Sequence, residues 1–285
     1  MIRLCAFSDE AAPDLQGQID ALKRNGIGMT ELRSVGGVNV SRLSKEDAEN
    51  IKKELDGSGI KVWSVGSPYG KVSLSDGFSE DKLFETLHRL CGLANVFGCD
   101  KIRVFSFYDA YDKAEQVKEL LGRSVMIAAS YGVGLYHENE KDIYGDVPDR
   151  VLELYNDVPG LRLVYDPANY IQCGQSADKT LPALCGITSY YHIKDVIAET
   201  GELVPSGFGD GQIGKITELA GTDTVFTVEP HLAVFAGYSE IDRSQMKNRF
   251  NYESNGEAFD AAVNALKTVL AERGFVYENG GYVRK

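Results

Sequence analysis

Four side chains that can bind a metal ion stand at the ends of consecutive strand-like runs in the second half of the sequence. They are Glu138 in LYHENE, Asp166 in LVYDPAN, His192 in YYHIKD and Glu229 in FTVEPH. Three carboxylates and one imidazole that converge on one point would repel one another unless a divalent cation lay among them. Oxygen ligands with a single nitrogen suit Mn²⁺, Mg²⁺ or Co²⁺ better than a metal that prefers thiolates. The sequence therefore predicts a metalloenzyme with one divalent ion, Mn²⁺ or Mg²⁺ first, with Co²⁺ and Zn²⁺ also open.

Short runs rich in β-branched and aromatic residues recur along the chain and alternate with helical segments. Eight such runs begin near residues 2, 28, 60, 101, 133, 161, 188 and 224. Apolar residues at helical spacing over residues 15–22 and again over 259–270 indicate amphipathic helices. A strand followed by a helix, eight times in 285 residues, has the count and length of a closed (β/α)₈ barrel, the TIM barrel of the α/β class. We therefore expect a single domain over residues 1–285, with the active site at the C-terminal ends of the strands.

The charge and the cysteines narrow the range of functions and partners. The chain carries 30 Lys and Arg against 42 Asp and Glu, a net charge of −12, which disfavours binding to nucleic acid or to an anionic membrane. Five cysteines without a CxxC pair predict neither a disulfide framework nor a thiolate zinc site. Acidic residues come too early for a secretory signal, and no apolar run reaches the roughly 20 residues of a membrane span. We expect a cytoplasmic protein that acts on a small molecule, with a homo-oligomer left open.

The alternation of side chains along each strand predicts which residues face the barrel interior together with the ligands. Lys194 lies two residues after His192, and His231 lies two residues after Glu229, so each pair shares a face. Lys194 and His231 are therefore candidates for holding substrate, and Asn169, three residues after Asp166, is a further candidate. For His231, a hydrogen bond that seals the barrel rim is an equally good explanation.

Several other features leave a structural and a functional interpretation open. Glu31 and Arg33 face inward near the end of the second strand, where a mutual ion pair explains them as well as a substrate contact does. Trp63, with Tyr69, could wall a sugar pocket or pack inside the barrel. The run GFGDG at 207–211 offers backbone donors to a phosphate, or forms a turn. A polar loop over residues 236–256 is a candidate lid over the barrel mouth or a contact with a partner subunit.

Four short motifs, one per strand–helix repeat, resemble those of the xylose isomerase-like TIM barrels. They are Glu-Asn at 138–139, Asp-Pro-Ala-Asn at 166–169, His-Ile-Lys-Asp at 192–195 followed by PSGFGDGQI, and Glu-Pro-His at 229–231. Within that superfamily the resemblance is to the sugar and sugar-phosphate isomerases and epimerases, which include ketose 3-epimerases, hydroxypyruvate isomerases and inosose dehydratases. The resemblance covers nearly the whole chain and specifies the superfamily better than any one reaction.

The resemblance implies that Glu138, Asp166, His192 and Glu229 bind one divalent cation and that the two glutamates double as acid and base. In related epimerases the metal holds two adjacent oxygens of a small carbohydrate. One carboxylate then removes a proton beside the carbonyl, and the other returns it. Return to the opposite face gives epimerisation, and return to the neighbouring carbon gives aldose–ketose isomerisation.

The departures from the family pattern keep a second reaction open. Many ketose 3-epimerases carry a histidine three residues after the second ligand and an arginine shortly after the ligand histidine, where this chain has Asn169 and Ala198. Lys194 instead resembles the inosose dehydratase branch, so a lyase that dehydrates a cyclic polyol ketone is the alternative. An apurinic-endonuclease-like nuclease is disfavoured by the four histidines in total and the net charge of −12. The retained ligands speak against a non-catalytic sugar-binding relative.

Overall fold

A closed parallel barrel forms the centre of the protein, as the computed structural model describes it over residues 1–75, 77–236, 247 and 250–285. The eight barrel strands run in one direction, each hydrogen-bonded to the next, and β12 pairs with β1 to close the ring. Their bounds are β1 Ile2–Ala6, β2 Met29–Leu32, β5 Lys61–Gly66, β6 Lys101–Val104, β7 Gly134–Glu138, β8 Arg162–Tyr165, β9 Thr188–Ile193 and β12 Thr224–Val228. The predicted TIM barrel and all eight predicted strands are confirmed.

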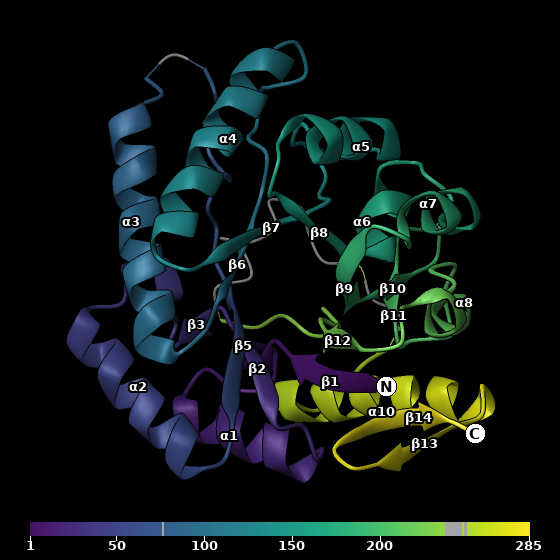
Figure 1. Ribbon diagram of the computed structural model, residues 1–285. Coiled ribbons are helices and arrows are strands. Elements are labelled where there is room, and N and C mark those ends of the chain that lie inside the picture. Colours follow the sequence, from purple (N-terminus) through teal and green to yellow (C-terminus); the bar gives the residue numbers. More distant parts are fainter. Residues whose placement is uncertain (76, 237–246, 248–249) are drawn as a thin grey trace.

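Helices follow the strands and surround the ring, as Figure 1 shows. They are α1 Leu15–Arg24, α2 Lys45–Gly57, α3 Glu80–Phe97, α4 Ala114–Ser130, α5 Pro148–Asp157, α6 Pro167–Gln172, α7 Ala177–Leu184, α8 Ile213–Leu219 and α10 Asn255–Glu272. Residues that favour the start of a helix lie at the first turns of several of these helices. Ser44 and Asp47 form a complete capping box at the start of α2, and Pro148 is the first residue of α5, where its missing N–H costs nothing.

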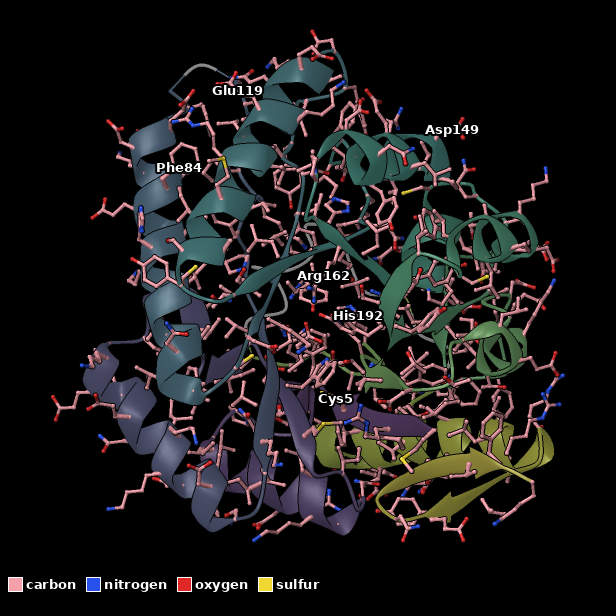
Figure 2. All side chains as sticks on the ribbon, viewed as in Figure 1. Cys5, Phe84, Glu119, Asp149, Arg162 and His192 are labelled. Carbon is pink, nitrogen blue, oxygen red and sulfur yellow. The ribbon has the colours of Figure 1, made fainter. Side chains whose placement is uncertain are left out.

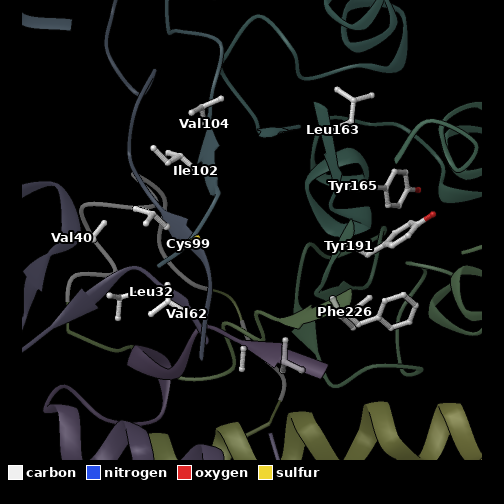
Figure 3. Packing of buried hydrophobic residues seen from close by; sticks show 14 of the residues in the cluster. Leu32, Val40, Val62, Cys99, Ile102, Val104, Leu163, Tyr165, Tyr191 and Phe226 are labelled. Atoms are coloured by element: carbon white, nitrogen blue, oxygen red, sulfur yellow. The ribbon is translucent and has the colours of Figure 1, made fainter. Parts of the chain in front are cut away.

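Apolar side chains pack on both faces of the barrel strands because each strand alternates its faces. The outward face packs against the helices, and the sticks in Figure 3, among them Ile102, Leu163, Tyr191 and Phe226, belong to that layer. The inward face near the N-terminal ends of the strands forms a smaller cluster inside the barrel, made of Cys5, Tyr136, Val164, Tyr190 and Val225 with Met29 and Trp63 beside them. This inner cluster, which we call the apolar floor, fills the barrel near the N-terminal ends of the strands. The ionisable residues lie above it, toward the C-terminal ends of the same strands.

Short elements at the strand ends shape the mouth of the barrel. The 3₁₀ turns η1 Ser8–Glu10 and η2 Val40–Arg42 follow β1 and β2. Two small hairpins, β3 Ser34–Val35 with β4 Val38–Asn39 and β10 Asp195–Val196 with β11 Leu203–Val204, follow β2 and β9. These segments bring polar residues of distant parts of the chain to one end of the ring.

A third hairpin extends the sheet beyond the barrel. Strands β13 Phe275–Glu278 and β14 Gly281–Arg284 follow α10, and β14 pairs antiparallel with β1 through Ile2 and Tyr282. This pair lies against α10 at the bottom of Figure 1. Among the described residues, no helix combines the length and the apolar character needed to cross a membrane.

Candidate metal centre

The four predicted ligands meet at the C-terminal mouth of the barrel. Glu138 is the last residue of β7, Asp166 follows β8 as the N-cap of α6, His192 lies in β9, and Glu229 follows β12. One donor atom from each lies within 4.8 Å of the others, and all four residues are buried. Figure 2 shows His192 inside the ring of strands. The sequence prediction that these side chains converge is therefore confirmed.

The donor atoms of this quartet fit a divalent cation. Nδ1 of His192 lies 2.9 Å from Oε1 of Glu138 and 3.2 Å from Oε2 of Glu229, but neither contact has the geometry of a hydrogen bond. His192 Nδ1, Asp166 Oδ2 and Glu229 Oε2 are all buried without a hydrogen-bond partner in the described part of the chain. A buried polar atom without a partner costs about 1–3 kcal/mol, and a cation among these atoms would remove that cost for His192 Nδ1 and Glu229 Oε2. Asp166 Oδ2 already lies 2.9 Å from Nζ of Lys194, and a cation would add to that compensation.

Glu31 orients the imidazole of His192 from below. Its Oε2 lies 3.1 Å from Nε2 of His192, and it also accepts hydrogen bonds from Tyr190 at 3.0 Å and Thr227 at 3.2 Å. A carboxylate on Nε2 fixes that nitrogen as the donor and leaves the Nδ1 lone pair for a metal. Burial lowers the pKa of His192, but Glu138 and Glu31 outweigh burial and raise it well above its usual value. The same negative field that would hold a proton on the imidazole would hold a cation.

Glu31 therefore has a different role from the two that the sequence left open. It neither pairs with Arg33 nor reaches the mouth, since its carboxylate is fully buried under His192. A register irregularity between Thr30 and Glu31 accompanies this inward position. Glu31 is a support for the imidazole of His192.

Glu138 is held by one arginine and one amide. Its Oε2 accepts a hydrogen bond from Nη1 of Arg103 at 2.8 Å, and its Oε1 accepts one from Nδ2 of Asn169 at 3.2 Å. Burial raises the pKa of Glu138, whereas His192 and Arg103 lower it, and the net value is about 2. Glu138 is thus ionised, with Oε1 turned toward Nδ1 of His192.

Glu229 is held by an arginine that serves three carboxylates. Nη1 of Arg33 donates to Oε1 of Glu229 at 2.9 Å, while its other nitrogens reach Asp9 at 2.9 and 3.0 Å and Glu10 at 3.1 Å. Burial raises the pKa of Glu229, but Lys194 and His192 lower it well below its usual range. Glu229 is therefore also ionised, with Oε2 on the side of His192.

Glu10 and His231 complete this side of the site. The backbone N–H of His231 donates to Oε2 of Glu10 at 2.7 Å, and His231 Nε2 lies 3.3 Å from the other oxygen of Glu10. Burial, Glu229 and Asp9 raise the pKa of Glu10 to about 8 against the opposing charge of Arg33. Glu10, Glu229 and His231 could themselves form a ligand group, but Arg33 contacts both carboxylates and supplies the positive charge there.

Lys194 and Asn169 lie beside the ligands, as the sequence predicted, and each contacts them directly. Nζ of Lys194 is 2.9 Å from Oδ2 of Asp166 and 3.7 Å from Oε2 of Glu229. Burial raises the pKa of Asp166 and Lys194 opposes this, with a net value of about 7. Asn169 donates its backbone N–H to Asp166 at 2.9 Å and its amide to Glu138. Asn169 thus ties two ligands together, and its role as a substrate contact stays a prediction.

Trp63 lies away from the mouth of the barrel, which favours packing inside the barrel over a wall of a sugar pocket, the two interpretations that the sequence left open. It lies in the apolar floor, with its ring 6.1 Å from that of Tyr190 and Nζ of Lys101 4.4 Å from its centroid. The cavity that it lines opens at the N-terminal ends of the strands. Its proposed companion Tyr69 is buried toward α4, where it bonds Ser124 at 2.6 Å.

The glycines of the run 207–211 are committed to an aspartate. The N–H groups of Gly207, Gly209 and Gly211 donate to the carboxylate of Asp195 at 2.8, 3.2 and 2.9 Å. A Cβ on Gly209 would lie 2.4 Å from Oδ1 of Asp195, so only glycine allows this approach. The run is a turn built around Asp195, and its donors do not face a phosphate.

Three residues of the site were not predicted from the sequence. The prediction for one loop falls largely outside the described residues. Asp9, Glu10 and Arg103 were not named, although Asp9 and Glu10 follow the end of β1 and Arg103 lies on β6. Applying the strand-end rule to the first half of the chain would have found them. The loop predicted as a lid over 236–256 has residues 237–246 and 248–249 outside the described residues.

Comparison with known proteins agrees with this geometry. The family model described as xylose isomerase-like TIM barrel matches residues 19–234. No curated protein matches the sequence. Solved structures with the same fold include the probable 3-DHS dehydratase AsbF from Bacillus anthracis, with 19% identity, a TM-score of 0.70, and coverage of 94% of this chain and 99% of that chain.

Two further structures are similar over nearly their whole length. IolI protein, solved with a binding zinc atom, has 16% identity and a TM-score of 0.73, with 95% of this chain and 98% of that chain covered. L-ribulose 3-epimerase has 16% identity and a TM-score of 0.70, with 95% and 97% covered. At these identities the likeness concerns the fold.

Proposed function

We propose that this chain, which belongs to the xylose isomerase-like TIM barrel family, is a divalent-metal-dependent isomerase or epimerase of a small sugar, sugar phosphate or sugar acid. The observation that carries the proposal is the convergence of Glu138, Asp166, His192 and Glu229 with three buried donor atoms that lack hydrogen-bond partners among the described residues. The epimerase among the structural neighbours supports the reaction class, and the zinc in another supports a divalent ion. We assign the whole chain to this single domain.

The two glutamates are suited to move a proton. A divalent cation held by the quartet supplies positive charge that lowers the cost of the negative charge formed when a C–H beside a carbonyl loses its proton. Glu138 and Glu229 are both ionised, and each gives one oxygen to an arginine and turns the other toward Nδ1 of His192. One ionised glutamate takes the proton from the carbon and becomes a carboxylic acid, which can return that proton to the neighbouring carbon in an isomerisation. For epimerisation the other glutamate must first be protonated, as Glu229 could be by Lys194, whose Nζ lies 3.7 Å from its Oε2, and it then donates that proton to the opposite face of the carbon. Asp166 and His192 act as ligands only.

The buried arginines and Glu31 keep these groups in position. Arg33 and Arg103 hold Glu229 and Glu138 ionised and fix their carboxylate planes, so that little reorganisation is needed when the proton moves. Glu31 holds the imidazole of His192 in one tautomer. The site thus excludes bulk water from its acid–base groups.

A dehydration that begins with the same proton abstraction is the second candidate. Lys194 favours it, because its ammonium lies between Asp166 and Glu229 and could donate a proton to a departing hydroxyl. The two reactions differ in their product. A dehydratase forms a conjugated carbonyl compound that absorbs in the ultraviolet, whereas an isomerase or epimerase does not.

Replacing a proposed base tests the reaction. Glu229→Gln keeps the side-chain size and the bond to Arg33 but removes the basic oxygen. We expect solvent deuterium exchange into ketoses, ketose phosphates or inososes to fall by roughly 10²- to 10⁴-fold, with the circular dichroism spectrum unchanged. Glu272→Gln, an exposed glutamate in α10, is the matched control. Near-normal exchange in Glu229→Gln would remove this residue from the acid–base role.

Metal analysis tests the ligand set independently of turnover. The purified protein should carry about one divalent ion per chain, and His192→Ala should lose it while remaining folded. Full activity after exhaustive chelation would contradict the proposal.

A further inference from the structure

A small basic cavity opens next to the arginines that bind the two proposed acid–base glutamates. Its volume is about 130 Å³, and the cations on its wall are Arg33, Arg42, Lys71 and Arg103. Asn39 and Ser41 add neutral polar groups, and every lining residue in the described ranges is non-acidic. At about 30 Å³ per water, such a volume holds roughly four waters, whereas whole-ligand pockets measure several hundred Å³. The cavity therefore fits one substituent of a substrate.

Arg103 is built into the wall of this cavity. Its side chain is 4% exposed, and its guanidinium carbon lies 4.5 Å from the ring centroid of Phe105 and 5.5 Å from that of Phe7. One N–H bonds Glu138, while Nε has no partner within the described residues. The guanidinium thus has donor capacity beyond what Glu138 uses.

Gly66, at the end of β5, keeps the wall open beside that guanidinium. A Cβ at this position would lie 3.4 Å from Nη2 of Arg103 and 2.7 Å from Cε1 of Phe7. Any other residue would therefore press on the ring that supports Arg103 and would take space from the cavity, which Gly66 itself lines. The glycine leaves the nitrogen edge of Arg103 accessible to a group in the cavity.

The cations of the lining come from separate elements of the chain. Arg33 and Arg103 already hold Glu229 and Glu138. Lys71, in the loop after β5, pairs with Glu140 at 3.0 Å and lies over the ring of Phe105, and Arg42 ends η2. This cationic lining stands in a chain of net charge −12 and beside a carboxylate-rich centre, both of which repel anions.

We propose that this cavity binds an anionic substituent, a carboxylate or phosphate group, of the substrate. The enzyme then acts on sugar acids or sugar phosphates in preference to neutral sugars, an inference that rests on the proposed function and narrows its substrate class. Guanidinium and ammonium groups bind oxyanions through charge-assisted hydrogen bonds. Arg33 and Arg103 separate the anionic group from Glu229 and Glu138 and so offset the repulsion between them.

Calorimetric titration of the full-length, metal-loaded protein tests the cavity without requiring turnover. The probes are inorganic phosphate, a ketohexose, its terminal phosphate ester and the corresponding keto acid. The phosphate ester or the keto acid should bind at least about tenfold more tightly than the ketohexose. Arg42→Gln and Lys71→Gln should each weaken the preferred anion by about tenfold, and should leave the ketohexose within about twofold.

Lys61→Gln, at an exposed lysine that begins β5, is the matched control and should leave all binding constants unchanged. If none of the three anions binds more tightly to the wild type than to Arg42→Gln or Lys71→Gln, the assignment of the cavity is wrong. A preference for the ester together with inorganic phosphate assigns a phosphate site, and a preference for the keto acid assigns a carboxylate site.

Deuterium exchange by the same proteins separates the two proposals. If the anions bind, and bind more weakly to Arg42→Gln and Lys71→Gln, but no probe exchanges deuterium, the proposed reaction is wrong and the assignment of the cavity stands. Exchange into the neutral ketohexose with unchanged kinetics in Arg42→Gln and Lys71→Gln would overturn the cavity and leave the reaction.

Discussion

The two halves of the candidate metal centre each contain a buried carboxylate that pairs with a buried arginine, but they differ in how many carboxylates share that arginine. In the Glu138 half, Arg103 serves one carboxylate, and Asn169 adds a neutral donor. In the Glu229 half, Arg33 serves Glu229 together with Asp9 and Glu10. The first half is a local ion pair, and the second is a hub that joins β1, β2 and β12 at the point where the barrel closes.

The two halves also differ in whether one of their carboxyl groups binds a proton near neutral pH. In the Glu138 half, His192 and Arg103 hold the pKa of Glu138 at about 2, so Glu138 itself takes no extra proton near neutral pH. In the Glu229 half, burial raises the pKa of Glu10 to about 8, so Glu10 takes the proton and Glu229 stays ionised. When several carboxylates lie close together, a proton on one of them, here Glu10, lowers the repulsion and lets another, here Glu229, stay ionised.

The largest expected effect that distinguishes the halves is the cost of removing each arginine. Arg33→Met leaves Asp9, Glu10 and Glu229 buried without their cation, and the free energy of unfolding should fall by about 3–5 kcal/mol or more. Arg103→Met leaves one carboxylate, which His192 still faces, and should cost less. Urea unfolding of the metal-free variants measures both. Equal losses would show that the hub and the local pair contribute alike.

The pH dependence of stability gives the next effect. The folded-state pKa of Glu10, about 8, lies above its usual value of 4.5, so its contribution is fully present below pH 4.5 and is lost as the pH rises through 8. Glu10→Gln removes this dependence. Between pH 5 and 8, the free energy of unfolding of the wild type should fall relative to that of Glu10→Gln by about 3 kcal/mol. Parallel curves for the two proteins would argue that Glu10 is ionised.

The convergence of Glu138, Asp166, His192 and Glu229 could be predicted from the sequence because their placement depends on local rules. Strand alternation makes His192 and Lys194 face inward, and the end of each strand marks the mouth of the barrel. Both rules hold within one repeat and need no knowledge of the partners across the barrel. The same rules would also have placed Asp9, Glu10 and Arg103 near the site. The contact of Arg33 with Glu229 could not be predicted in this way, because it depends on closure of the ring, which joins residues 196 positions apart.

The same rules could not predict how deep in the barrel Trp63 lies, or that the loop at 207–211 folds back onto Asp195. The register between β2 and β5 skips Trp63, and this irregularity, which alternation does not predict, accompanies its place in the floor beside Tyr190. The donors of 207–211 are used by Asp195 only because the loop folds back on it. The hairpin β13–β14 did carry a signal, Asn279-Gly280, with both φ angles positive, as a tight hairpin turn requires.

The smallest expected effect concerns the neutral donor that only the Glu138 half contains. Asn169→Ala removes the amide that bonds Oε1 of Glu138 and the carbonyl of Asn139, but keeps the backbone N–H on Asp166. Stability should fall by about 1 kcal/mol, and metal affinity by about tenfold, because two ligands lose their common support. Competition with a chelator measures the affinity, and Asn264→Ala in α10 is the control. An unchanged metal affinity would mean that Arg103 alone orients Glu138, and the two halves would then differ only in how many carboxylates share an arginine.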